Sequence, residues 1–213
     1  MHNFIILILY IIVKLPTLID FCYQSGYDAD TNVTRKSPAH YARKREGNMK
    51  KEELAARLKN ACACVVESES LLTEIDSKFG DADHGLTMSK IAAAITQAVD
   101  ESQGGIQNML DDAAMAVMEL NGGSAVPLWN TWLDGMQEAA PAGDAVDVAG
   151  LQAMFANAFE ALDDISGAKE GDKTMMDALI PASRAIAAYT GSDEAALFAL
   201  AAQAARAGAE ASK

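Results

Sequence analysis

From position 49 to near the C-terminus, apolar residues recur every three or four positions, which is the period of an amphipathic helix. Short runs rich in Gly, Pro, Asn and Asp separate seven such segments. Their apolar positions lie within residues 54–75, 91–99, 106–117, 129–136, 148–162, 175–189 and 193–209. No stretch after residue 49 alternates apolar and polar positions with period two. The pattern predicts an all-α domain of antiparallel helices joined by short loops.

The small residues in these segments indicate how the helices pack. Many positions are alanine, and small side chains let helix axes approach closely. The ten methionines are interpreted as core filling, because their flexible thioethers fit irregular gaps. Pro181 falls inside the sixth segment and has no backbone N–H to donate. We therefore expect a kink or a broken turn at Pro181.

The first 48 residues differ in kind from the rest. They are slightly basic and begin with an apolar run at positions 4–13. Ten residues are too few to span a bilayer, which needs about 20. The run also lacks the basic start and the small-residue cleavage site of a signal peptide. We expect translation to begin at Met49, so that residues 1–48 are no part of the native domain at 49–213; a short membrane anchor is the alternative.

Composition narrows the possible classes of protein. The formal net charge is −13, which argues against a nucleic-acid-binding protein because a phosphate backbone would be repelled. The three cysteines are too few and too close for a disulfide framework. Half of the residues are hydrophobic, which is ample for a packed core. These features favour a cytoplasmic protein that binds neither nucleic acid nor membrane.

The most informative loop follows the first predicted helix and contains three carboxylates, Asp76, Asp81 and Asp83, within eight residues. Crowded carboxylates repel one another unless a cation is present, and oxygen-only ligands favour Mg²⁺ or Ca²⁺. The register of an EF-hand is missing. His84 is the only histidine after Met49, so zinc and a Ser-His-Asp triad are poorly supported. The simpler alternative is that Asp81 or Asp83 caps the next helix.

Two further loops are candidates for phosphate binding. The segment at 121–127 places two glycines and Ser124 before a helix, where N–H groups and a hydroxyl can meet a phosphate. A glycine pair after a helix is also an ordinary C-terminal cap. In the segment at 167–177, either Asp172 or Thr174 is expected to cap the sixth helix. Lys173 is a candidate phosphate contact in the same segment. Neither loop is specific by itself.

Taken together and in order, the three loops resemble the L subunit of dihydroxyacetone kinase. The resemblance rests on Gly-Asp-Ala-Asp-His-Gly-Leu-Thr-Met at 80–88, the Gly-Gly-Ser loop, and Gly-Asp-Lys-Thr-Met-Met-Asp at 171–177, and it covers about residues 50–213. It implies an antiparallel barrel of eight helices, of which about seven are expected here, with a nucleotide site at one rim. It also implies that Asp76, Asp81 and Asp83 hold two Mg²⁺ ions that bridge the nucleotide phosphates.

The resemblance assigns the remaining contacts and partners. The residues it places against ADP or ATP are His84, Gly85, Leu86, Thr87, Gly123, Ser124, Ala125, Val126, Gly167, Thr174 and Met175. The function it implies is transfer of a phosphoryl group to dihydroxyacetone held on a separate K subunit, with no protein nucleophile. The resemblance also implies an M subunit of the phosphotransferase system as a further partner. The phosphoryl donor is then either that system or ATP. A homodimer also remains open.

The sequence departs from the family pattern at three places. Ala125 and Val126 stand where Ser and Gly are usual, which removes a hydroxyl and adds a branched side chain beside the phosphates; Ser124 is a candidate replacement. Ala82 replaces a usual Gly, which is tolerated if its φ is negative. The family continues with another helix carrying a Gly-Arg-Ala-Ser-Tyr motif, whereas this sequence ends at Lys213. We expect exposed apolar helix faces and weaker nucleotide binding as a result.

Two other functions fit the same residues. The chain could be a binding or regulatory module that keeps the fold without turnover. It could also be the L subunit of a kinase for a related ketose such as erythrulose, because sugar selectivity lies in the K subunit.

Overall fold

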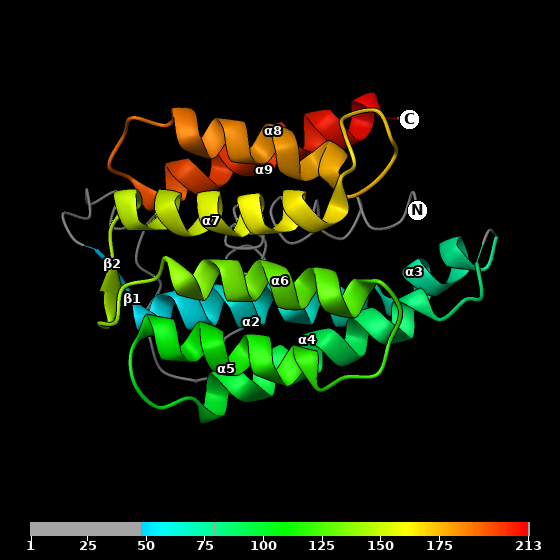
Figure 1. Cartoon of the computed structure of the whole chain (residues 1–213), viewed down its shortest axis with the longest axis horizontal. Coiled ribbons are helices and arrows are strands. Elements are labelled where there is room, and N and C mark those ends of the chain that lie inside the picture. Colours follow the sequence, from blue (N-terminus) through cyan, green and yellow to red (C-terminus); the bar gives the residue numbers. More distant parts are fainter. Residues whose placement is uncertain (1–47, 79, 213) are drawn as a thin grey trace, which may run out of the picture.

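The computed structural model describes residues 48–78 and 80–212, and its helices run antiparallel along one long axis (Figure 1). The helices are α2 (Lys51–Glu67), α3 (Glu69–Asp76), α4 (His84–Glu101), α5 (Ile106–Met118), α6 (Ala125–Glu138), α7 (Val148–Ser166), α8 (Met176–Ala188) and α9 (Glu194–Ala211). The expected all-α class is confirmed. Within the described part of the chain there are eight helices, one more than the seven predicted segments.

The additional helix arises from a break at Ser68. The prediction of one helix through residue 75 was wrong, because α2 ends at Glu67 and α3 begins at Glu69. The Ser68 hydroxyl donates a 2.8 Å hydrogen bond to the carbonyl oxygen of Cys64, four residues back. Such side-chain bonds to the preceding turn compete with the helical ladder and bend it. In Figure 1, α3 leads away from the body of the bundle toward the first loop.

A very short antiparallel ladder joins the start of the domain to its middle. The strands β1 (Met49–Lys50) and β2 (Ala145–Val146) pair Met49 with Val146. Two residues are too few to produce a period-two pattern, which is why the sequence did not predict them. Met49 is buried at this ladder. The proposed boundary at residue 49 concerns residues 1–47, which lie outside the described residues.

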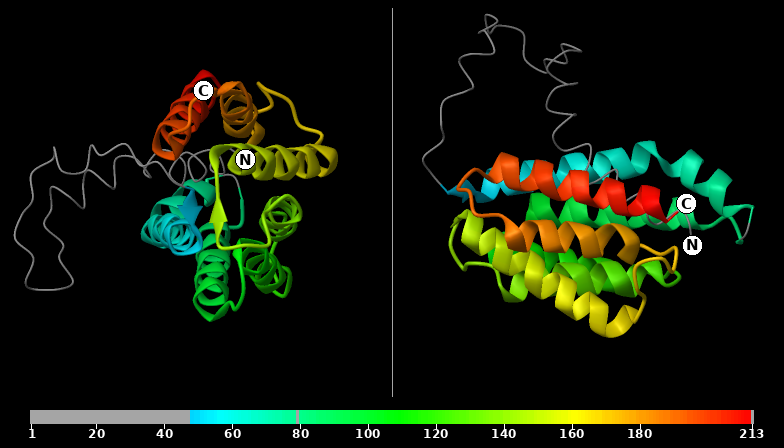
Figure 2. Two further views of the ribbon diagram at one scale, coloured as in Figure 1. Left: turned by 90° about the vertical axis from the view of Figure 1, so that its left-hand side faces the viewer. Right: turned by 90° about the horizontal axis from the view of Figure 1, so that it is seen from above.

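The helices surround an apolar interior, as in a barrel (Figure 2). Its fully buried side chains come from successive helices and include Ile91, Leu110, Leu151, Met154 and Leu197. A cavity of about 150 Å³ lies among α2 and α4 to α9 and is lined almost entirely by apolar side chains. Burial of these side chains supplies most of the stabilisation of the fold.

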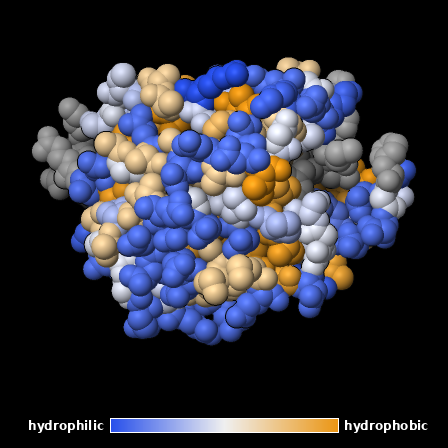
Figure 3. Space-filling view, viewed as in Figure 1, coloured by the Kyte–Doolittle hydropathy of each residue, from blue (hydrophilic) through white to orange (hydrophobic). Residues whose placement is uncertain are grey.

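The face of the molecule drawn in Figure 3 is largely polar, with separate apolar patches. The exposed large apolar residues are Val66, Leu71, Leu86, Met115, Met118, Ile165 and Leu200. Across the described residues, none of the helices combines the length and the hydropathy that a membrane span requires.

Helix α8 runs through Pro181 without a break in its assignment. Because Pro181 has no N–H, the carbonyl oxygen of Asp177 loses its helical partner. Gly208 of α9 lies against this carbonyl, and a Cβ at position 208 would overlap it. The expected broken turn is absent, since α8 continues through Pro181, and α9 packs closely on α8 at this position.

Candidate functional site

Three loops gather at one end of the bundle, the right-hand end in Figure 1. They precede α4, α6 and α8, and the alternating direction of the helices brings these three N-termini to the same end. Each N-terminus carries unsatisfied N–H groups and a partial positive charge. Such ends bind anions, and phosphates above all. This end of the molecule is therefore suited to a phosphorylated ligand.

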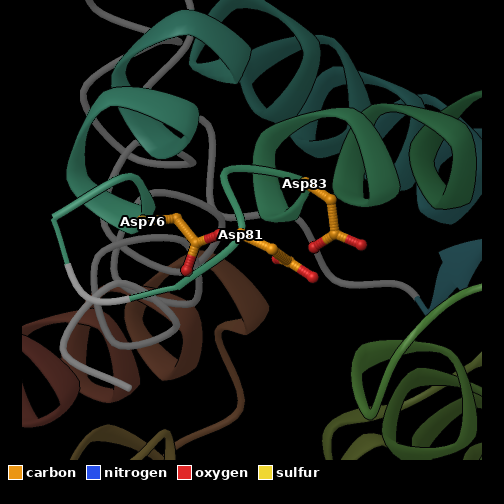
Figure 4. A group of neighbouring side chains, drawn as sticks. All are labelled: Asp76, Asp81 and Asp83. Atoms are coloured by element: carbon orange, nitrogen blue, oxygen red, sulfur yellow. The ribbon is translucent and has the colours of Figure 1, made fainter.

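The three aspartates of the first loop converge at this end, with Asp76 ending α3 and Asp83 preceding α4 (Figure 4). Each offers one carboxylate oxygen, and these three oxygens lie within 4.8 Å of one another. Asp76 is half-buried, while Asp81 and Asp83 are exposed. The group combines the hard oxygen ligands that Mg²⁺ prefers with an open side for solvent or phosphate. The structure thus brings together the three residues that the sequence singled out.

Electrostatics within the cluster favour a bound cation. The pKa of Asp83 is raised above its ordinary value, first by a hydrogen bond with Asp81, then by desolvation and the negative charges of Asp81 and Asp76. A raised pKa of this kind means that the crowded carboxylates favour positive charge between them more than an isolated aspartate does. A divalent cation that displaced the proton would relieve the same repulsion.

The backbone of the loop corrects one prediction. Ala82 has a φ of 63°, so the tolerance that depended on a negative φ does not apply. An L-residue in this left-handed region carries a cost of roughly 1–2 kcal/mol. The loop keeps this conformation while it turns Asp81 and Asp83 to the same side as Asp76 (Figure 4). Strain of this kind often occurs where a loop is shaped for a ligand.

The capping alternative is only partly met. Asp83 is the N-cap residue of α4, but its side chain makes no capping hydrogen bond. Asp76 instead accepts a long hydrogen bond of 3.4 Å from the backbone N–H of His84. The cap is thus supplied by Asp76 across the loop, and neither Asp81 nor Asp83 is needed for it.

The first turn of α4 divides its four candidate residues between the interior and the surface. Leu86 is 49% exposed, whereas Gly85 and Thr87 are buried. Gly85 lies against α3, where an added Cβ would come within 2.9 Å of the Thr73 backbone nitrogen and would overlap the Glu69 carbonyl. This packing against α3 explains why position 85 is glycine. At the adjacent position, burial lowers the pKa of His84, which favours a neutral imidazole.

The second loop lies directly against this turn. A Cβ at Gly122 would come within 3.2 Å of the Thr87 methyl group and 2.7 Å of a Val126 methyl group. Val126 and Ala125 are buried, whereas Gly123 and Ser124 are exposed. The branched side chain that replaces a usual glycine therefore packs inward, and the surface of the loop is formed by Gly123 and the Ser124 hydroxyl.

The third loop is tied to the start of α8. Thr174 directly precedes Met175, the N-cap residue of α8, and its hydroxyl oxygen accepts from the Met176 N–H at 3.2 Å. Asp172 accepts instead from the Lys169 N–H within the loop. Gly167 ends α7 in the left-handed region with a φ of 61°, and Met175 is buried. Of the two proposed caps, the structure supports Thr174.

Sequence reasoning gave no role to Asp177. Its carboxylate is buried and accepts hydrogen bonds from two backbone N–H groups of the third loop, those of Gly171 at 2.6 Å and Thr174 at 2.8 Å. The signal in the sequence was an aspartate in the first turn of a predicted helix, two residues after a candidate ligand contact. An aspartate at such a position can anchor the preceding loop as well as favour the helix start.

The chain is similar to a known family and to several named proteins. A family model described as the DAK2 domain matches residues 78–213. The ADP-binding subunit of PEP-dependent dihydroxyacetone kinase from Escherichia coli K12 is 31% identical over 125 residues, which are 56% of this chain and 58% of that protein. D-Erythrulose kinase from Mycolicibacterium smegmatis is 33% identical over 147 residues, which are 66% of this chain and 25% of that protein.

A solved structure has the same fold. The dihydroxyacetone kinase from C. freundii, crystallised with AMP-PNP and Mg²⁺, superposes with a TM-score of 0.54 at 21% identity. The match covers 85% of this chain and 37% of that one. This chain thus spans less than two thirds of the length of these relatives.

Proposed function

Because the chain belongs to the DAK2 domain family, we propose that it is the nucleotide-carrying L subunit of a dihydroxyacetone kinase. The observation that carries the proposal is the convergence of Asp76, Asp81 and Asp83 within 4.8 Å at the end where three helices begin. Carboxylates for a metal and N–H groups for phosphates are what a Mg-nucleotide requires. The names of the relatives, an ADP-binding subunit among them, support the same ligand.

The residues present fit a magnesium site. Asp76, Asp81 and Asp83 supply only carboxylate oxygens, and the hydrogen bond with Asp81, desolvation and the neighbouring negative charges raise the pKa of Asp83, which supports a place for a cation here. These three carboxylates would hold two Mg²⁺ ions beside a bound nucleotide. Bound magnesium neutralises phosphate charge and fixes the geometry of transfer.

The chain's own groups then bind and orient the nucleotide. The N-terminal turn of α4 places Leu86 at the surface beside the aspartates, where its apolar side chain can cover part of the ligand. The exposed Gly123 and Ser124 offer an N–H and a hydroxyl from the adjoining loop. Gly167, Thr174 and Met175 complete the set from the third loop. No side chain in this set is required as a nucleophile, because transfer depends on alignment and charge neutralisation.

The acceptor sugar is proposed to lie on a second polypeptide. The K subunit is the expected partner, and the exposure of Asp81 and Asp83 supports access by a second polypeptide. A relative from E. coli is named a subunit of a PEP-dependent kinase, which supports an M phosphotransferase subunit as a further partner. Bound ADP would then be rephosphorylated in place.

Erythrulose is the second candidate acceptor. D-Erythrulose kinase from M. smegmatis and L-erythrulose kinase from Pectobacterium atrosepticum are 33% and 34% identical to this chain over their matched segments. Since the nucleotide domain does not select the sugar in this proposal, both candidates predict the same site here. Assay of one reconstituted complex with dihydroxyacetone and with each erythrulose enantiomer distinguishes them.

The metal site is tested by titration calorimetry with ADP in the presence of Mg²⁺. Asp76→Asn, Asp81→Asn and Asp83→Asn should each remove Mg²⁺-dependent binding. Asp112→Asn is the matched control, because Asp112 is an exposed carboxylate on α5 outside the cluster. Normal binding by all three cluster variants contradicts the site. Phosphate transfer to a supplied K subunit distinguishes an active subunit from a module that only binds.

A further inference from the structure

Asp177 is a buried carboxylate for which the proposed chemistry has no direct use. It lies in the first turn of α8 with 3% of its surface exposed. One of its oxygens accepts from the Gly171 N–H at 2.6 Å, and the other accepts from the Thr174 N–H at 2.8 Å. Both oxygens are thus engaged by the loop that precedes the helix, and the N-terminus of α8 favours the negative charge.

The loop held in this way has an unusual backbone. Gly171 has a φ of 95° and Lys173 a φ of 60°, so both residues have a left-handed backbone. Gly171 itself donates to Asp177, and Lys173 lies between the two donors, Gly171 and Thr174. Lysine adopts such a conformation at a cost, and surrounding contacts must fix it. The two hydrogen bonds to one rigid carboxylate supply such contacts, and they set the position of Thr174 and Met175.

Asp177 is itself held from the other side. Its carbonyl oxygen lies against Gly208 of α9, and a Cβ at position 208 would also come within 2.6 Å of Pro181. The backbone of Asp177 therefore packs against α9, while its side chain holds the third loop. The contact links a remote helix to the end of the molecule where the three aspartates lie.

We propose that Asp177 is a positioning residue for the nucleotide: its ionised carboxylate preforms the segment from Gly171 to Thr174 so that Thr174 and Met175 meet the ligand. This inference rests on the proposed function. The two N–H groups bind different oxygens of Asp177, and an amide at position 177 would replace one of these oxygens with an NH₂ donor, which cannot accept from an N–H group. Asp177→Asn keeps the size of the side chain and releases one end of the loop.

The test compares affinity with stability. We expect Asp177→Asn to weaken binding of Mg·ADP at least tenfold by titration calorimetry. Asp193→Ala is the matched control, because the Asp193 carboxylate also accepts from two backbone N–H groups, of Ala195 and Ala196, at a helix start. That helix start lies at the opposite end of the bundle (Figure 1). The control should lower Tm and leave the Kd for Mg·ADP unchanged.

Amide hydrogen exchange provides a readout that does not depend on the variant. In the unsubstituted protein without ligand, the Gly171 and Thr174 amides should be protected; exchange at the rate of free amides overturns the proposal. Unchanged Mg·ADP affinity in Asp177→Asn overturns this role alone. Absence of Mg·ADP binding by the unsubstituted chain overturns the proposed function, and this role with it.

Discussion

Gly85 allows a direct test of whether packing or ligand contact requires glycine at the start of α4. In Gly85→Ala, the new Cβ would overlap the Glu69 carbonyl oxygen and approach the Thr73 backbone nitrogen to 2.9 Å. Both are backbone atoms of α3, so no side-chain rotation relieves the overlap. An ordinary carbon–oxygen contact is about 3.3–3.6 Å, so α3 must move by roughly 1 Å.

The expected cost follows from two opposing effects. Overpacking costs typically about 1–3 kcal/mol, and replacing glycine by alanine within a helix returns up to about 1 kcal/mol. With an overpacking cost of about 2 kcal/mol, the middle of that range, the net loss is about 1–2 kcal/mol. For a domain of this size, each kcal/mol corresponds to a change in Tm of about 2–4 °C. We therefore expect a fall of roughly 2–8 °C without any ligand.

Thermal and urea denaturation of the ligand-free protein measure this loss. Gly143→Ala is the control, because nothing lies within 4 Å of a Cβ at position 143. A Tm for Gly85→Ala equal to that of Gly143→Ala refutes the packing argument. It would leave ligand contact as the reason for glycine at position 85.

Three further predictions concern the loops and the contact between α8 and α9. Ala82→Gly should stabilise the metal-free protein by about 0.5–1 kcal/mol in urea titrations. Glycine removes the steric cost of a φ of 63°, and this gain exceeds the conformational entropy that glycine loses on folding. An unchanged midpoint contradicts this. Gly208→Ala should lower Tm, since a Cβ there meets the Asp177 carbonyl and Pro181, whereas equal stability would mean that α9 shifts freely. The raised pKa of Asp83 means that the folded, metal-free protein binds this proton more tightly than the unfolded chain does, so its contribution to stability grows as pH falls and is lost as pH rises through the folded pKa. Because Mg²⁺ must displace the same proton, Mg²⁺ affinity should fall as pH is lowered, and the fall should begin at a pH above the usual pKa of an aspartate. A Mg²⁺ affinity that does not change with pH in this region contradicts the prediction.

Much of the fold follows from the period of the apolar residues, because each helix buries one face against its neighbours. The break at Ser68 was not predicted, since it depends on a local hydrogen bond to Cys64 and leaves the apolar spacing almost unchanged. The pairing of Met49 with Val146 joins residues far apart in the chain, and two-residue strands have no pattern of their own.

The candidate site was predictable as a set of residues but not as an arrangement. The spacing of Asp76, Asp81 and Asp83 indicated a metal cluster, and the structure brings the three together. The sign of φ at Ala82 and the inward packing of Val126 depend on the path of the loops, which residue types alone do not determine.

The most direct measurement is the Tm of the full chain with ADP and Mg²⁺ against ADP and EDTA, with Asp76→Asn in parallel. At 100 times the Kd, a ligand adds about 2.7 kcal/mol to stability, which corresponds to roughly 5–11 °C here. We predict a rise with Mg²⁺ that is absent with EDTA and absent in Asp76→Asn. A Tm that does not respond to Mg·ADP, or a rise of equal size in Asp76→Asn, would contradict a nucleotide site built on the three aspartates.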